Sequence, residues 1–397
     1  MSRLRSAAQN GGLALLALAL VFGVLELGTR LFVSPEVWRF RDASADWQID
    51  RRIGWVNKPQ SDESLRIVEE VVRYRTNEDG IFPWDTRRER QPGVDRVMVF
   101  GDSMVVGRSL PQDLVYTARL EERLAARGLS VEVINAGVEG YSTDQALLLM
   151  ERLLPIYQPD VAVYGSTLND FGGNSSREAY LQPKPMFSFR EGEGLRLAAP
   201  EPRERIHPRT MGWRSVPQHS AFYRWLQPRI FRLRARLGDW RQRMLLGEMQ
   251  LVYVQPDLLD QLDWSLYAAL LSRMQRAARA AHGEFLFFSH PEVGEVWEPY
   301  IANVVERFRV PRGAYDPRAV ERRVRRAARR AGVPFVPTVQ YFAARSQRGP
   351  FHLLPHDAHL SPAGHQVLAE LLAEELQALL AQEGERRLRA AEAAANP

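Results

Sequence analysis

A regular alternation of short apolar runs and amphipathic stretches begins at residues 97–103, whose sequence is VMVFGDS. The apolar run 97–100 has the length of a buried strand, and it ends at a glycine, an aspartate and a serine. Two patterns then alternate along the chain, helix-like at 114–127, strand-like at 131–134, helix-like at 143–157 and strand-like at 161–164. Buried runs that alternate with helices indicate βαβ units and a parallel sheet.

The alternation is interrupted at residues 177–255, which are rich in Pro and Arg and include a basic amphipathic stretch at 223–244. We interpret this segment as an insertion or lid. The alternation resumes with a helix at 258–281, a strand at 285–288, a helix at 318–331, a strand at 334–336 and a final helix at 362–382. The sequence therefore predicts a doubly wound, three-layer α/β/α sandwich with a parallel sheet, whose ligands bind beyond the carboxyl ends of the strands.

Residues 11–33 form a long apolar stretch that carries no charge before Glu26. As a helix it is long enough to cross roughly 30 Å of hydrocarbon. Arg3 and Arg5 precede it, which favours a cytoplasmic segment 1–10 and a body outside the membrane. A cleaved signal peptide is the main alternative, but its apolar region is normally shorter and ends at small residues. The other alternative is a buried helix of a soluble protein. We predict an uncleaved transmembrane anchor.

The anchor divides the rest of the chain into three parts. Residues 34–93 have only short apolar runs and are predicted to be a juxtamembrane segment that lies against the main domain. The main domain is assigned to residues 94–382. Residues 383–397 are rich in Glu and Arg and are expected to form a charged tail that frays.

Composition excludes several classes of function. The 397 residues are 45% apolar and 25% charged, which is the balance of a folded globular chain. The absence of cysteine excludes a thiolate nucleophile, disulfides and Cys-ligated metal centres. The net charge of +5 comes mainly from scattered arginines, because only Lys58 and Lys184 among the 53 basic residues are lysines. The densest arginine cluster, 318–330, fits a solvated helix face, so we predict no nucleic-acid partner.

Ser103 is a candidate nucleophile because it stands on the turn that follows the run 97–100. Gly101 permits tight backbone geometry there, and a nearby helix start would offer N–H groups to an oxyanion. The motif is not the G-x-S-x-G turn of α/β-hydrolases, because residue 105 is Val. Asp102 is expected to make a turn or helix-cap hydrogen bond.

Two further stretches follow the next two predicted strands and offer hydrogen-bond donors. The first is NAGVEG at 135–140, with Gly140 at its end, and the second is YGSTLND at 164–170, with Asn169 and Asp170 at its end. A glycine N–H and an asparagine amide at adjacent strand ends are the donors that an acyl-transfer site needs around a developing oxyanion. Asp170 is expected to have a structural role like that of Asp102.

The sequence HDAHLSPAGH at 356–365 leads into the last predicted helix. His359 is a candidate general base, and Asp357, two residues before it, is a candidate for orienting the imidazole. Four of the eight histidines lie between residues 352 and 365, but a triad explains His359 better than a metal site does. The stretch 290–292, His-Pro-Glu, follows another predicted strand, where it could line the cleft, but we interpret its role as structural.

These four blocks, GDS, N-A-G-x-x-G, N-D and D-x-H-L-S-P-x-G-H, resemble those of the SGNH or GDSL hydrolase superfamily over residues 96–380. The superfamily has a flavodoxin-like fold and includes esterases, lipases, thioesterases and carbohydrate O-acyl esterases. Membrane-anchored extracytoplasmic members are the most similar in layout. The resemblance implies Ser103 as nucleophile, His359 as base and Asp357 as its orienting acid. It also implies an oxyanion hole made of the Ser103 and Gly140 backbones and the Asn169 side chain.

The chain departs from the superfamily pattern at two places. Acid and base are often spaced D-x-x-H, whereas the residue three before His359 is His356. The third block is commonly G-x-N-D, whereas Gly165 lies four residues before Asn169. Gly137 remains an alternative to Gly140.

The resulting hypothesis is a membrane-anchored, serine-dependent acyl-ester hydrolase or acyltransferase that acts outside the cytoplasmic membrane, in the periplasm or its equivalent. It requires neither cofactor nor metal. Its substrate would be an acylated small molecule, a lipid or an envelope glycan, and its activity would fall as His359 becomes protonated. One alternative is a non-catalytic envelope scaffold or glycan-binding module. The other is a membrane-surface binding protein that uses its arginine-rich helices.

Overall fold

The computed structural model describes residues 2–33, 46–67, 70–107, 110–180, 182–200, 220–223, 225–226, 251–307, 309–311, 313–353 and 358–395. Its centre is a five-stranded sheet in the order β13-β12-β7-β5-β6, in which every neighbouring pair is parallel. The strands are β5 (Asp95–Gly101), β6 (Val131–Gly137), β7 (Val161–Ser166), β12 (Glu284–Ser289) and β13 (Phe335–Val336).

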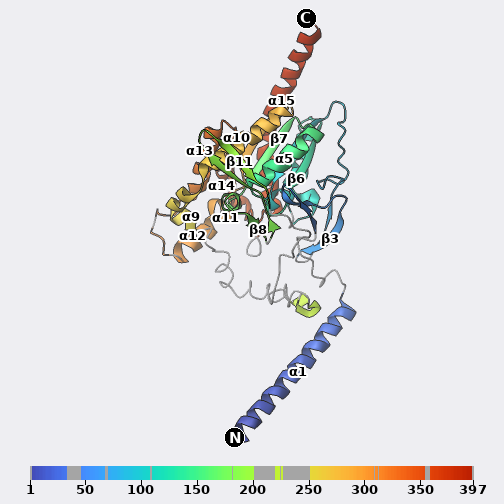
Figure 1. Ribbon diagram of the computed structural model, residues 1–397, viewed down its shortest axis with the longest axis vertical. Helices are drawn as coiled ribbons and strands as arrows, with labels where there is room; N and C mark the ends of the chain where they lie inside the picture. The colour runs from blue at the N-terminus through green and yellow to red at the C-terminus, as the bar shows by residue number, and fades with distance from the viewer. Residues whose placement is uncertain are drawn as a thin grey trace.

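Helices cover both faces of this sheet (Figure 1). Along β5, Met98 and Phe100 pack into one buried cluster, whereas Val97 and Val99 pack into another on the opposite face. Both predicted features, the parallel sheet and the three-layer α/β/α sandwich, are therefore confirmed. The described helices are α1 (Ser2–Phe32), α3 (Ser103–Val106), α4 (Tyr116–Ala125), α5 (Thr143–Tyr157), α6 (Asn169–Asn174), α9 (Leu251–Val254), α10 (Trp264–Ala280), α11 (Val293–Val296), α12 (Glu298–Arg307), α13 (Ala319–Ala331), α14 (Val339–Ala343) and α15 (Pro362–Ala395).

Several boundaries differ from those predicted. Strands β6 and β7 extend to Gly137 and Ser166, so parts of the two donor motifs lie inside the sheet. Helix α10 begins only at Trp264, because the Asp263 side chain accepts from the Leu266 N–H and caps it there. Helix α15 continues to Ala395 instead of ending near 382, since the tail is rich in helix-forming Ala, Glu, Arg and Leu.

Short antiparallel hairpins add to the sandwich. Strands β1 (Trp47–Asp50) and β2 (Gly54–Asn57) pair with each other, as do β3 (Asp62–Ile67) and β4 (Glu70–Arg75). In the predicted insertion, β8 (Glu178–Ala179) pairs with β9 (Gln182–Pro183) and β10 (Met186–Arg190) with β11 (Gly194–Ala198). The predicted basic stretch 223–244 lies mostly outside the described residues.

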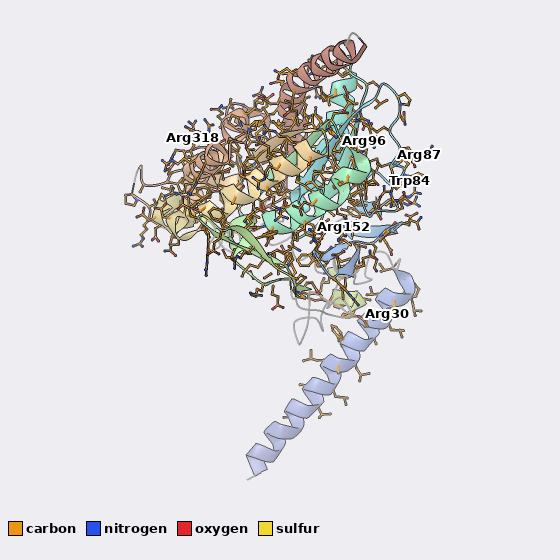
Figure 2. The ribbon with its side chains drawn as sticks, turned by 45° about the horizontal axis from the view of Figure 1, so that its top comes forward. Arg30, Trp84, Arg87, Arg96, Arg152 and Arg318 are labelled. Carbon is orange, nitrogen blue, oxygen red and sulfur yellow. The ribbon has the colours of Figure 1, made fainter. Side chains whose placement is uncertain are left out.

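Helix α1 extends away from the globular part at the N-terminus (Figure 1). The stretch Asn10–Phe32 has a mean hydropathy of 2.1, and its most apolar part is not buried within the structure, so this helix is long and apolar enough to cross a membrane. Near its end Glu26 pairs at 2.7 Å with Arg30, which is labelled in Figure 2. The Glu26 carboxylate also accepts from the Ser220 hydroxyl and the Ala221 and Phe222 N–H groups at 2.8–2.9 Å. A short part of the insertion is thereby attached to the helix.

A buried ion pair connects the insertion to the sandwich. Lys184 Nζ lies 2.6 Å from Asp144 Oδ2, and both side chains have no exposed surface. The ammonium group also donates to the carbonyls of Gly173 and Pro185 at 2.9 and 3.0 Å. Asp144 lies in the first turn of α5, where the helix dipole favours a negative charge. The pair therefore fixes the segment after α6 and the strand β9 against the start of α5.

We expect Lys184→Met to destabilise the full-length protein by about 3–5 kcal/mol, because it leaves the Asp144 carboxylate buried without its partner. Urea unfolding in detergent, followed by tryptophan fluorescence, measures the effect. Lys58 is exposed, so Lys58→Met is the matched control and should change the free energy of unfolding by less than about 0.5 kcal/mol. Equal stabilities of the two variants would contradict this account of the pair.

Candidate active site

Ser103 lies on the turn between the end of β5 and the start of α3. Asp102 is the N-cap of α3, and its Oδ1 accepts from the Met104 N–H at 3.0 Å, as predicted. Ser103 is therefore the first residue of the helix, where backbone N–H groups have no intrahelical partner. Its own N–H donates to no acceptor within the part of the chain that is described. Its hydroxyl and this N–H lie at the carboxyl edge of the sheet.

Gly101 makes the sharp turn possible. A Cβ atom at this position would stand 2.5 Å from the carbonyl oxygen of Gly165 on β7 and from Cγ2 of Val105 on α3. Both neighbours are fixed, the first by the sheet and the second by burial. Only glycine leaves room for β5 and β7 to stay paired while the chain turns into α3.

His359 reaches Ser103 from the far end of the sequence, and its Nε2 lies 2.8 Å from the Ser103 Oγ. The loop that carries it is closed by a bridge between His352 and Leu360 and by a hydrogen bond from the Leu353 N–H to the His359 carbonyl. Ser361, two residues after His359, caps α15, because its Oγ accepts a hydrogen bond from the Gly364 N–H. Asp357 lies outside the described residues, so its assignment as the orienting acid stays a prediction.

The structure distinguishes between the two candidate oxyanion donors of the stretch 135–140, Gly137 and Gly140. Gly137 is the last residue of β6, and its N–H donates to the Asn135 Oδ1 at 2.9 Å. Gly140 lies beyond the strand with a φ of +80°, and its N–H has no acceptor among the described residues. Gly140 therefore retains a donor for a ligand and Gly137 does not. Asn135 meanwhile attaches α3 to β6, because its Nδ2 donates to the Val105 carbonyl at 2.6 Å.

Asn169 is the first residue of α6 and is exposed, and no described residue accepts from its side-chain amide. The residues around it are held by Asp170, whose Oδ2 accepts from the Tyr164 hydroxyl at 2.7 Å and from the Thr167 N–H at 3.1 Å. The Thr167 hydroxyl in turn donates to the Asp102 Oδ2 at 3.0 Å. The loop with Asn169 is thus joined to the turn with Ser103 by buried side chains.

Several ionisable groups near the site are shifted away from their charged forms. Burial raises the pKa of Asp102, and burial together with the nearby Asp102 carboxylate raises the pKa of Asp170 still more. Burial lowers the pKa of both His290 and His365 to about 3. These imidazoles are therefore neutral at pH 7, and the N–H of Tyr116 donates to Nδ1 of His365 at 3.1 Å. His359 is the one histidine that contacts Ser103 within the described chain.

Glu292 belongs to the site more closely than the sequence indicated. It follows β12 and forms a capping box with Glu295, and its carboxylate accepts from the Leu168 N–H, next to Asn169. Its pKa is raised to about 7, chiefly by burial and also by the nearby Asp102 carboxylate, while the hydrogen bond from Leu168 and the attraction of His359 oppose the rise. The sequence signal was its place directly after a buried strand.

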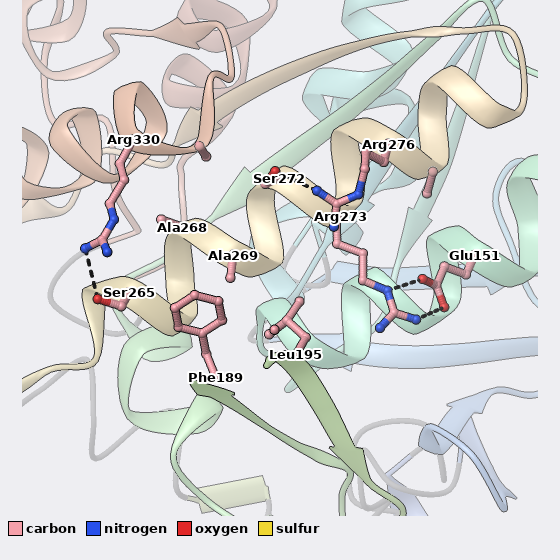
Figure 3. A pocket seen from close by; sticks show the side chains of 13 residues that line it. Glu151, Phe189, Leu195, Ser265, Ala268, Ala269, Ser272, Arg273, Arg276 and Arg330 are labelled. Carbon is pink, nitrogen blue, oxygen red and sulfur yellow. Dashed lines mark hydrogen bonds and ion pairs between the residues drawn. The ribbon is translucent and has the colours of Figure 1, made fainter. Parts of the chain in front are cut away.

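One cavity of about 620 Å³ lies elsewhere, between the β10–β11 hairpin and helix α10 (Figure 3). Its floor is formed by small residues of α10. Arg273 crosses it to make a bidentate contact with Glu151, at 2.6 and 3.1 Å. None of Ser103, Gly140, Asn169 and His359 lines this cavity. It is therefore separate from the candidate active site.

Comparison with known proteins gives the class of the chain. The model of the GDSL-like lipase/acylhydrolase family matches residues 99–367, which is more than half of the chain and contains Ser103 and His359. The protein therefore belongs to the GDSL family of esterases and acylhydrolases, and it is a hydrolase of that family.

Individual relatives are more distant. An arylesterase of Vibrio mimicus is 29% identical over 76 residues, which are 19% of this chain and 38% of the arylesterase. Among solved structures, TesA has a TM-score of 0.39 and 15% identity and covers 72% of this chain and 99% of its own. The acetyl xylan esterase AlAXEase has a TM-score of 0.39 and 14% identity, over 70% of this chain and 98% of its own.

We expect Glu292→Gln to move the acidic limb of the kcat/KM profile to lower pH by about half a unit or more, because a carboxylate near His359 stabilises the protonated imidazole. The profile is measured on a small acetate ester between pH 5 and 9. Glu298→Gln, at an exposed position on α12, is the control and should leave the limb in place. A limb that does not move in Glu292→Gln would show that the carboxylate does not act on the base.

Proposed function

We propose that this protein is a serine-dependent esterase, with Ser103 as nucleophile, His359 as general base and Asp357 as the acid that orients His359. The observation that carries the proposal is the 2.8 Å contact between His359 Nε2 and Ser103 Oγ, made across 256 residues of sequence. Membership of the GDSL family supports it. A hydroxyl alone is a weak nucleophile, and a neighbouring imidazole is the group that activates it.

The reaction proceeds through an acyl-enzyme. His359 Nε2 takes the Ser103 proton while Oγ bonds to the acyl carbon of the ester, and the carbonyl oxygen becomes an oxyanion. The C–O bond to the alcohol then breaks, and the alcohol leaves with the proton from His359. Water, deprotonated by the same imidazole, attacks the acyl-serine and releases the carboxylic acid and free Ser103.

Three donors stabilise the oxyanion, namely the N–H of Ser103, the N–H of Gly140 and the side-chain amide of Asn169. They follow β5, β6 and β7, which are neighbours in the sheet. None of the three has a protein acceptor within the described ranges, so each is available to a substrate. Donors that are fixed before the reaction stabilise the developing charge without reorganisation.

The enzyme acts outside the cytoplasmic membrane, where α1 anchors it with Arg3 and Arg5 on the cytoplasmic side. The apolar helix Asn10–Phe32 supports the anchor. An extracytoplasmic site makes O-acylated envelope glycans the first class of substrate and lipid esters the second. Transfer of the acyl group to a sugar hydroxyl needs only that an alcohol replaces water in the second step.

The test of the nucleophile is labelling of the full-length protein in detergent by a fluorophosphonate, followed by intact mass. We expect stoichiometric addition to the wild type, and none to Ser103→Ala or His359→Ala. Circular dichroism establishes that both variants are folded. A folded wild type that takes no label would contradict the proposal and favour a scaffold or glycan-binding role.

We expect Asn169→Ala to lower kcat on a simple acetate ester by about 10²–10³-fold with little change in KM, because it removes one donor to the oxyanion. Asn169 is exposed, so the melting temperature of the variant should match that of the wild type. A kcat within about threefold of the wild type would exclude Asn169 from the oxyanion hole.

A further inference from the structure

The ring of Tyr180 lies directly against Gly140, the residue whose N–H is a proposed oxyanion donor. A Cβ atom at Gly140 would stand 2.5 Å from Cδ2 of Tyr180 and closer still to Cε2. Tyr180 is nevertheless 40% exposed, so much of its ring faces solvent beside this donor. It is one of the few large hydrophobic side chains of the globular part that are exposed to this degree.

The backbone of Tyr180 is held in an unfavourable conformation. The residue lies in the turn between β8 and β9 with a φ of +52°. This left-handed region disfavours residues with a large side chain, and non-glycine residues held there gather at functional sites. A glycine or asparagine would suit the turn better, so the turn itself does not explain a tyrosine.

Contacts of the residues after the turn hold strand β9 in place. Lys184 follows β9, and its buried contacts to Asp144 and to the Gly173 carbonyl fix that end of the hairpin. On the other side, the Pro183 carbonyl packs so close to Gly54 that a Cβ there would be 2.5 Å from it. The strand that follows Tyr180 is therefore anchored on both sides.

Two buried tryptophans form the wall behind the ring. Trp47 lies 6.3 Å from Tyr180 between ring centroids and stacks on Trp55 at 5.3 Å. The Trp55 Nε1–H donates to the Glu139 carbonyl, next to Gly140. Both indoles are almost fully buried, so Tyr180 alone presents aromatic surface from this cluster.

We propose that Tyr180 determines specificity by stacking on the pyranose ring of the alcohol part of the substrate, beside the oxyanion donor Gly140. This inference rests on the proposed function and names the substrate class as O-acetylated sugars. A pyranose has an apolar C–H face that packs on an aromatic ring, while its hydroxyl groups stay hydrated at the rim.

The environment of Tyr180 favours a sugar over a fatty acyl chain. An acyl chain gains most from an enclosed apolar channel, because the gain follows the apolar area removed from water. Tyr180 instead lies on an open surface, and Arg177 and Glu178 in the same segment are exposed. Such a surface suits a ligand with one apolar face and a polar rim.

The test compares two acetate esters in a pH-stat with the full-length protein. One is a mono-O-acetylated methyl xylopyranoside and the other is ethyl acetate, which has no ring. We expect Tyr180→Ala to lower kcat/KM for the glycoside at least tenfold, mainly by raising KM. The same variant should change kcat/KM for ethyl acetate less than threefold. Tyr180→Phe and Tyr180→Trp should retain most of the activity on the glycoside.

Trp84→Ala is the matched control. Trp84 is 50% exposed and lies under the Arg75 guanidinium at 3.6 Å. It is three residues from Arg87, whose carbonyl accepts from Arg96, and Figure 2 labels all three residues. Arg96 stands at the amino end of β5, whereas Ser103 follows the carboxyl end of that strand. This variant should leave both activities unchanged.

Equal losses on both esters, or no loss on either, would overturn the proposal. A loss of activity in Tyr180→Ala that is confined to ethyl octanoate would also overturn it, because it would place the acyl chain at Tyr180. A wild type that neither hydrolyses any ester nor takes a fluorophosphonate label refutes the proposed function instead. In that case saturation-transfer NMR with the same glycoside tests the sugar contact directly. Binding to the wild type that is lost in Tyr180→Ala supports the contact, and no binding to the wild type overturns it.

Discussion

Three glycines stand side by side at the carboxyl edge of the sheet, and the site depends on this arrangement. Gly101 of β5 pairs in register with Gly137 of β6 on one side and with Gly165 of β7 on the other. A Cβ on Gly137 would lie 2.7 Å from the Val106 nitrogen, and one on Gly165 would lie 2.6 Å from Cε1 of His290. Because no side chain occupies this row, α3 packs directly over the strand ends. Ser103 is thereby held at the edge where the neighbouring loops bring their donors.

Buried polar side chains then tie the loops to one another. Asn135 joins β6 to α3, Thr167 joins the loop after β7 to Asp102, and Glu292 joins β12 to that same loop. Each contact leaves the donors of Ser103, Gly140 and Asn169 unused by the protein. Burying so many polar groups is costly unless they are paired, so the pairing fixes the relative positions of the loops. The result is a site that is organised before the substrate binds.

The sequence predicted the sandwich because its signals are local. Apolar runs of strand length and helical periodicity lie within single segments, and α5 begins and ends at the predicted residues. The ends of β6 and β7 were missed because Asn135 and Ser166 are polar residues that the sheet buries. The hairpins β1–β2 and β8–β9 were missed because their strands are only two to four residues long, too short for an alternating apolar pattern to be recognised. Tyr180 gave no sequence signal, since its contact with Gly140 depends on a turn conformation and on the buried pair at Lys184. The pairing of Ser103 with His359 was predictable only because the motifs occur together in order.

The contact between Glu26 and residues 220–222 joins the N-terminal helix to the insertion. Its carboxylate satisfies two backbone N–H groups and one hydroxyl of the insertion, and Phe22 packs edge-on against Phe222 at 5.9 Å. A chain cut after the helix would lose these acceptors and this aromatic partner together. The apolar helix and residues 220–222 are therefore held together, so that a fragment lacking the helix would differ from the full-length protein in this part of the insertion as well.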